Sequence, residues 1–282
     1  QDFYKMQYPL TEVSYISLQV VPSQADYKVA LDEKNKAVAE LRTATASNIE
    51  EVLRGYTTSS KFFSKTFLTG AELDELGLGA EQVAFIKGSE AGAVNDPQLV
   101  SDRYDVVKLV GKKMATSGVS VRMIVLSDSV KGQADSIMAQ LNSGASFAEL
   151  AKKHSLDQST AASGGLIQLP NRYGMVDSTF SESKLIQIAQ GSGLNLDTLY
   201  KVPVGTVVRL GRAPISVLVR AENPQPAVES YQVAFVSIPA TFSPETYNEK
   251  YAAMNRILGG GGGFEAMAKK AEKEGFSVAR NI

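Results

Sequence analysis

The chain has 282 residues, in which 29 Lys and Arg stand against 30 Asp and Glu, giving a formal net charge of −1. It contains no Cys and one His, which excludes disulfides, thiol nucleophiles, thiolate zinc sites and metal sites with two His ligands. The balanced charge argues against a dedicated nucleic-acid binder, no apolar run approaches the ~18–20 residues that cross a bilayer, and the length predicts two or three domains of ~100–200 residues each.

The first segment of the chain has the pattern of a strand followed by two helices. Residues Glu12–Val21 alternate and are rich in β-branched and aromatic side chains, which predicts a strand. Ser23 lies three residues before Asp26, a spacing typical of a helix N-cap. The helix is then marked by apolar residues at helical spacing, namely Tyr27, Leu31, Val38 and Leu41. A shorter helix is predicted over Asn48–Tyr56.

The middle segment repeats this order. Val119–Leu126 reads as a strand, and the helix after it is marked by Val130, Ala134, Ile137 and Leu141. Ser146 and Glu149 have the spacing of a capping box, which predicts that the short helix Phe147–His154 begins here.

A third instance follows near the end of the chain. Tyr231–Ile238 reads as a strand, Ser243 as an N-cap and Pro244 as the first residue of a helix. The stripe of that helix consists of Tyr247, Tyr251, Met254 and Leu258. We interpret Tyr247, Tyr251 and Met254 as core; if this copy lacks a covering sheet, they are instead exposed for a partner. Phe264–Glu272 is the short helix of this copy.

The recurrence of strand, long helix and short helix predicts three copies of one module, the third cut short. The Pro- and Gly-containing segments Ala115–Ser120 and Asn223–Val228 separate the copies. The predicted modules are residues 1–117, 118–224 and 225–282.

Each complete copy closes with short alternating segments, at Tyr104–Val110 in the first and Val217–Arg220 in the second. A strand, two helices and further strands in ~100 residues predict an α+β module with a small antiparallel sheet covered by helices. The run Gly259–Gly263 is interpreted as a loop between two helices. A phosphate cradle is disfavoured because no Lys-Ser or Lys-Thr follows the glycines and no strand precedes them.

The middle copy carries a more specific pattern. Its strings are Arg122–Val125, Gly144–Ser155, Leu156–Asp157 and the pair Gly164–Gly165, and the part from Phe147 to Gly165 is the most specific. This pattern resembles the parvulin family of peptidyl-prolyl cis–trans isomerases, and within it the envelope foldases of the PpiD and SurA type. The resemblance implies tandem parvulin-like (FKBP-like) modules, with the flanking copies as degenerate ones.

The resemblance also implies site residues. Met123 occupies the place of the family's first His, Ser216 that of its second His, and Asp157 that of its central Cys or Asp. The family's apolar proline pocket corresponds to Ile167, Met175 and Phe180. Two alternatives stay open: Asp157 as a turn or cap residue after a helix, and Met175 with Phe180 as plain core packing.

His154 lies close in sequence to Ser155 and Asp157, which suggests a Ser–His–Asp triad. Triads are usually assembled from distant segments, and neighbours at one helix end do not easily form such a line. We therefore interpret His154 as a surface or helix-end residue.

Together these patterns predict a foldase or chaperone region that binds unfolded or proline-containing polypeptide clients, with isomerase activity weak or lost. The alternatives are an active isomerase and a structural spacer without binding. No cofactor, metal or nucleic acid is expected. By resemblance the chain belongs to the periplasm or cell envelope, as a fragment of a longer protein whose membrane anchor lies outside this chain; a start at Gln1 also indicates a processed or cut chain.

Overall fold

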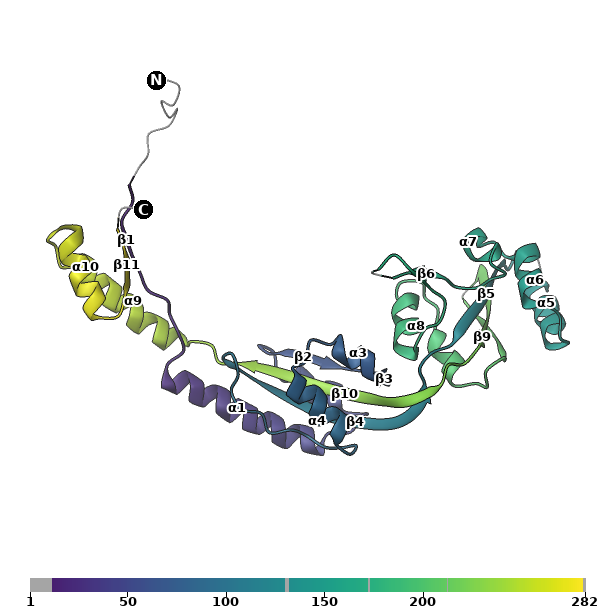
Figure 1. Ribbon diagram of the computed structural model, residues 1–282, viewed down its shortest axis with the longest axis horizontal. Helices are drawn as coiled ribbons and strands as arrows, with labels where there is room; N and C mark the ends of the chain where they lie inside the picture. The colour runs from purple at the N-terminus through teal and green to yellow at the C-terminus, as the bar shows by residue number, and fades with distance from the viewer. Residues whose placement is uncertain (1–11, 130–131, 172, 212, 281–282) are drawn as a thin grey trace, which may run out of the picture.

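The computed structural model describes residues 12–129, 132–171, 173–211 and 213–280. The chain forms an α+β structure with antiparallel strand pairs, as predicted. Its units follow one another along a curved axis (Figure 1). We call them the helical end (residues 12–23 and 241–280), the trunk (24–116 and 227–240) and the inserted lobe (117–226).

The trunk is built around two long strands that run side by side. Its elements are α1 (Gln24–Thr43), α2 (Ile49–Arg54), β2 (Ser60–Phe63), β3 (Leu68–Thr69), α3 (Gly70–Asp74), α4 (Ala80–Gly88), β4 (Arg103–Thr116) and β10 (Ala227–Pro239). β10 pairs antiparallel with β4 on one side and with β2 and β3 on the other.

The sequence pattern separates residues 225–282 as a third module, and here the structure differs. β10 pairs with β4 from Ala227↔Thr116 to Pro239↔Arg103, so the first and third predicted modules share one sheet. Both faces of β10 are buried: Val236 packs with α1 and α2, and Val233 packs with α3 and α4. A strand with two buried faces needs covering layers and paired neighbours, which a strand and two helices alone do not supply.

The helix predicted after Ser23 is α1, and its N-terminus closes with a capping box between Ser23 and Asp26. The predicted stripe is correct at Val38 and Leu41, which are buried against the sheet. It is wrong at Leu31, which is 38% exposed. The buried face of α1 passes instead through Ala30 and Lys34.

The inserted lobe lies between β4 and β10 in the chain. Its elements are β5 (Ser120–Ser127), α5 (Gln133–Asn142), α6 (Phe147–His154), α7 (Gln158–Ala161), β6 (Leu169–Pro170), β7 (Val176–Asp177), α8 (Glu182–Ala189), the 3₁₀ helix η1 (Leu196–Tyr200), β8 (Val207–Leu210) and β9 (Ile215–Glu222). The helix α6 has the predicted bounds. α5 buries Ala134, Ile137 and Leu141 as predicted, whereas Val130 lies outside the described residues.

The lobe has a sheet of order β5-β9-β8 with helices on both faces. Ile124 and Leu126 of β5 pack against α5 and α6. Val119 and Val121 pack on the opposite face, against α8 and η1. Alternate residues of β5 therefore enter two different cores, which fixes the register of the strand.

The helical end consists of α9 (Pro244–Gly259), α10 (Gly263–Lys273), β1 (Tyr15–Ser17) and β11 (Ser277–Ala279). The strand predicted over Glu12–Val21 is reduced to β1, which pairs with β11 at the other end of the chain. The predicted cap Ser243 is confirmed, and the glycine run lies between α9 and α10 as expected.

The interpretation of the α9 stripe as core is wrong at Tyr247 and Tyr251, whereas Met254 packs against the core of the helical end. Tyr247, Tyr251 and Leu258 are 46%, 56% and 51% exposed, and α9 buries Ala253 and Ile257 instead. The two Tyr rings stack on each other at the surface. The alternative of exposed side chains therefore describes the two tyrosines, since no strand among the described residues covers this side of α9.

Asp26 joins the trunk to the helical end. Its carboxylate accepts hydrogen bonds from the Ser23 amide (2.8 Å) within its own capping box. It also accepts from the amide of Ser243 (3.2 Å), the N-cap of α9, and from the Thr246 hydroxyl (2.6 Å). Asp26 and Thr246 are both buried, so this carboxylate closes two helix N-termini at once.

We expect the contribution of Asp26 to stability to disappear in acid. The hydrogen bonds from Thr246 and Ser23 hold the pKa of Asp26 well below its usual value. A carboxyl group with a lowered pKa stabilises the fold above its unfolded-state pKa of about 4, and this stabilisation is lost as the pH falls below that value. Urea unfolding at pH 7 should give Asp26→Asn a lower free energy of unfolding than the parent. At pH 3 the difference in free energy between the two proteins should be smaller. An Asp32→Asn control, at an exposed ion pair, should show little gap at either pH.

Candidate functional site

Some of the predicted site residues lie along the edge of β5 that does not pair with β9. The segments that reach this edge do so through backbone hydrogen bonds of 2.8–2.9 Å: Phe180 at Val119, Ile167 at Val121, Gly165 at Met123 and Leu156 at Val125. Asp157 directly follows Leu156. Segments far apart in the sequence are thus aligned beside one strand.

Met123 and Ser216 lie on opposite faces of the lobe sheet. Met123 packs with the core on the α8 side, and its partner across the sheet is Val219. Ser216 is paired with Leu126, which enters the core on the α5 side. The two positions that stand for the family's histidines therefore do not face each other.

Ser216 belongs to a polar cluster on its own face. It is buried, it accepts hydrogen bonds from Arg209 at 2.8 and 3.0 Å, and it donates to Asp128. Arg209 also forms ion pairs with Asp128 and Asp135. This cluster ties β8 and β9 to the start of α5.

Asp157 is the N-cap of α7. Its carboxylate accepts hydrogen bonds from the amide and hydroxyl of Ser159, at 3.1 and 2.6 Å, and from the Thr160 hydroxyl at 2.7 Å. Burial acts to raise the pKa of Asp157, but these hydrogen bonds outweigh it, so the pKa lies below its usual value. Asp157 is therefore held as an anion that closes a helix, as the cap alternative describes.

The three predicted pocket residues have different surroundings. Ile167 and Phe180 are 8% and 3% exposed and belong to the core between the sheet and α8. Met175 is 61% exposed, between the short strands β6 and β7. The structure therefore brings Ile167 and Phe180 together and leaves Met175 at the surface.

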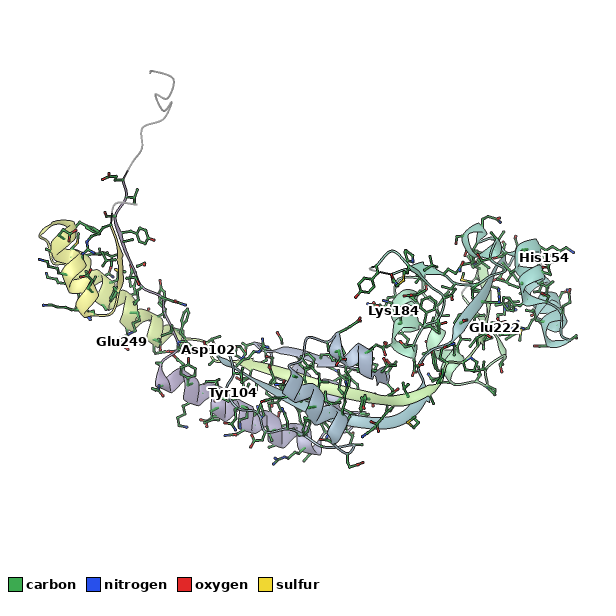
Figure 2. All side chains as sticks on the ribbon, viewed as in Figure 1. Asp102, Tyr104, His154, Lys184, Glu222 and Glu249 are labelled. Atoms are coloured by element: carbon green, nitrogen blue, oxygen red, sulfur yellow. The ribbon has the colours of Figure 1, made fainter. Side chains whose placement is uncertain are left out.

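His154 is the last residue of α6, next to two lysines in the same turn. Figure 2 shows it on the far side of the lobe from Lys184 of α8. The adjacent Ser155 hydroxyl is used locally, since it accepts hydrogen bonds from the amides of Val125 and Asp157. This arrangement matches the helix-end interpretation of His154.

Two residues of the family-like strings, to which the sequence assigned no role, position the segments at this edge. Gly165 has φ +79, and a Cβ there would lie 2.5 Å from the Met123 carbonyl oxygen. Arg122 donates to the carbonyls of Ser163 (3.1 Å) and Gly164 (2.7 Å) and pairs with Glu222 at 2.9 Å. The only sequence signal for them was their place inside the family-like strings.

Arg122→Ala is expected to lower the free energy of unfolding of the lobe by about 2 kcal/mol. The substitution removes one of the two arginines that pair with Glu222 (19% exposed), so that only Arg220 remains, and it frees the carbonyls of the glycine loop. Lys152→Ala is the control, because its ion pair with Glu149 is exposed and its loss should cost less than about 1 kcal/mol. Hydrogen exchange of the lobe amides measures both, and equal losses would show that Arg122 has no special role.

The trunk has surface cavities of about 270 and 490 Å³. The larger lies beside α4 and is lined by Leu78 and Val83 with Asp74 and Lys87. Within the described ranges, no three His, Asp or Glu side chains gather as a metal ion would require. Over the same ranges, no helix has the length and apolar character to cross a membrane.

Residues 104–200 match the family model described as the PPIC-type PPIASE domain. The match begins in β4, covers the helices and the glycine loop of the lobe, and ends in η1 before β8 and β9. The matched residues are about a third of the chain, so the likeness to the PPIC-type domain is one of its middle part, and it is the parvulin family that the sequence strings also resemble.

No curated protein matches the chain significantly. Among solved structures, the chain is similar to the peptidylprolyl isomerase PrsA from Bacillus anthracis, with 16% identity, 58% of this chain and 63% of that chain covered, and a TM-score of 0.28. It is also similar to the foldase protein PrsA from Streptococcus pneumoniae, with 14% identity, coverages of 74% and 59%, and a TM-score of 0.30. The peptidylprolyl isomerase PrsA from Bacillus cereus is 14% identical, with 91% of this chain and 85% of that chain covered and a TM-score of 0.27. The chain spans less than two thirds of the length of the first two proteins.

Proposed function

We propose that this chain is a foldase region of the PpiD and SurA type that binds unfolded or proline-containing segments, with peptidyl-prolyl isomerase catalysis weak or lost. The observation that carries this proposal is Met123. It stands at the position of the family's first His, within β5, and its side chain packs against an apolar core.

Catalysis of proline isomerisation has definite physical requirements. Rotation about an X–Pro bond has a barrier of about 20 kcal/mol, and an isomerase lowers it with an apolar slot and polar groups suited to the twisted amide. The side chain of Met123 has no hydrogen-bond donor, and Ser216 faces the other side of the sheet. The carboxylate of Asp157 already accepts hydrogen bonds from Ser159 and Thr160. These contacts leave the edge of β5 without a polar pair for the amide.

Binding of an extended chain needs less than catalysis does. Leu156 is 56% exposed beside the β5 edge, and Met175 and Val176 are each 61% exposed near the β6–β7 pair. Exposed apolar side chains of this kind suit a segment of unfolded polypeptide that has apolar residues to bury. We propose such segments, of envelope proteins by resemblance, as the clients, and the periplasm or cell envelope as the location.

The test is a titration of the full chain with an unfolded outer-membrane-type peptide, followed by fluorescence of a label on the peptide. We expect saturable binding, weakened roughly tenfold by Met175→Asp, since a buried carboxylate would replace an apolar contact. The matched control is Val29→Asp, which alters a 66% exposed Val on the trunk helix α1 and should leave binding unchanged. If the parent chain gives no saturable signal, the lobe is a structural spacer and the proposal fails.

A further inference from the structure

Glu72 connects the trunk to the inserted lobe through its side chain. It lies in α3 and forms a capping box with Thr69, whose amide and hydroxyl donate to Oε2 at 2.7 and 2.9 Å. Its other oxygen, Oε1, accepts from the hydroxyls of Ser181 and Ser183. Those two serines lie at the N-terminus of α8, in the lobe. One carboxylate is therefore shared between helix ends of two units.

The covalent connection between these units is a narrow pair of chain segments, which we call the neck (residues 117–119 and 223–226). The β4–β10 pairing ends at Thr116↔Ala227, and the β5–β9 pairing begins at Ser120↔Glu222. Between them, hydrogen bonds cross the neck from the Ser117 amide to Pro226 and from the Gln225 amide to Gly118. At its lobe end the neck is held by Val119, which is buried in the lobe core and pairs with Phe180. The two-stranded part nearer the trunk bends more easily than the packed units on either side.

Asp26 offers a comparison within the same chain. It is also the acid of a capping box, and it also reaches the N-cap of a helix in another unit. Asp26 is buried and bonded to the Ser243 amide, whereas Glu72 is half-buried and meets the lobe only through two serine hydroxyls. Hydrogen bonds that water can replace are worth little net free energy, so the Glu72 contact is the one that can open and close.

We propose that Glu72 is a releasable latch: its hydrogen bonds to Ser181 and Ser183 hold the PPIC-type lobe against the trunk, and the lobe swings on the neck when they are lost. The latch adjoins the candidate site, because Ser181 follows Phe180, whose backbone pairs with Val119 of β5. A charge interaction also links the two units here, between Lys113 of β4 in the trunk and Glu182 of α8 in the lobe. Burial raises the pKa of Glu182, and the charge of Lys113 opposes that rise.

The test measures the distance between the units in the full chain. Because the chain has no Cys, cysteines introduced at two exposed positions, Glu81 of α4 and Lys153 of α6, can each carry a spin label. Double electron–electron resonance should give one narrow distance distribution for the parent. Ser183→Ala removes a latch bond and leaves the cap of α8, Ser181, in place. We expect it to broaden the distribution and shift it to longer distances, and Glu72→Ala to do so more strongly.

Two controls separate the latch from local helix effects. Thr69→Ala removes the capping-box partner of Glu72 but leaves its bonds to the lobe, so its distribution should match the parent. Ser143→Ala removes a hydroxyl that bonds only within its own helix end, to the Ala139 carbonyl, and should also match. The latch is overturned if Ser183→Ala gives the parent distribution, or if Thr69→Ala broadens it as much as Glu72→Ala does.

Discussion

Phe180→Ala should lower the free energy of unfolding of the lobe by about 3–5 kcal/mol. Phe180 is 3% exposed, and its ring lies in the core between the sheet and α8. Removing it takes a large apolar side chain out of a packed interior and leaves a cavity. Met175→Ala, at another predicted pocket position, should change stability by less than about 0.5 kcal/mol, because Met175 is 61% exposed.

Native-state hydrogen exchange of the β5 amides is the measurement for this pair, since it reports the stability of the lobe separately from the trunk. The reverse pattern would contradict the packing described above. If Phe180→Ala kept its exchange protection and lost only peptide binding, Phe180 would line an open slot rather than fill the core.

Gly165→Ala should destabilise the lobe by about 3 kcal/mol or more. Gly165 has φ +79, which L residues rarely adopt, and its backbone accepts a hydrogen bond from the Met123 amide. A Cβ at this position would lie 2.5 Å from the Met123 carbonyl oxygen and 3.1 Å from the Ala151 side chain. The glycine loop would have to leave the edge of β5, and the candidate site would open.

The matched control is Gly191→Ala, because Gly191 also has a positive φ (+86) but a Cβ there would meet nothing within 4 Å. It should cost only about 1 kcal/mol, the price of the backbone conformation. Equal losses at the two glycines, measured by hydrogen exchange in the lobe, would mean that the close approach to β5 contributes nothing.

The elements that depend on local sequence could be predicted well. The capping signals at Ser23 and Ser243 and the bounds of α6 are found as expected, because a helix end is determined by residues within one turn. The pairing of β10 with β4 could not be predicted in the same way. It joins residues more than a hundred positions apart, and the alternation of Tyr231–Ile238 is satisfied by any sheet that covers both its faces.

The candidate site was predicted in part. The family-like strings pointed to Met123, which lies in β5, and to Ile167 and Phe180, which lie beside that strand and enter the same core. The strings could not predict which face of the sheet carries Ser216. A shift of one residue moves every side chain of a strand to the other face, and only the pairing of β9 with β5 determines the register. The exposure of Met175 likewise depends on how the β6–β7 segment folds.

The most direct test of the account is a protease-coupled isomerisation assay of the full chain on a proline-containing peptide, run beside an established parvulin. We predict a rate at or only slightly above that of the uncatalysed exchange, which takes tens to hundreds of seconds, although the peptide still binds. A rate well above background, lost in Asp157→Ala, would contradict it and show that the edge of β5 catalyses proline isomerisation without the family's histidines.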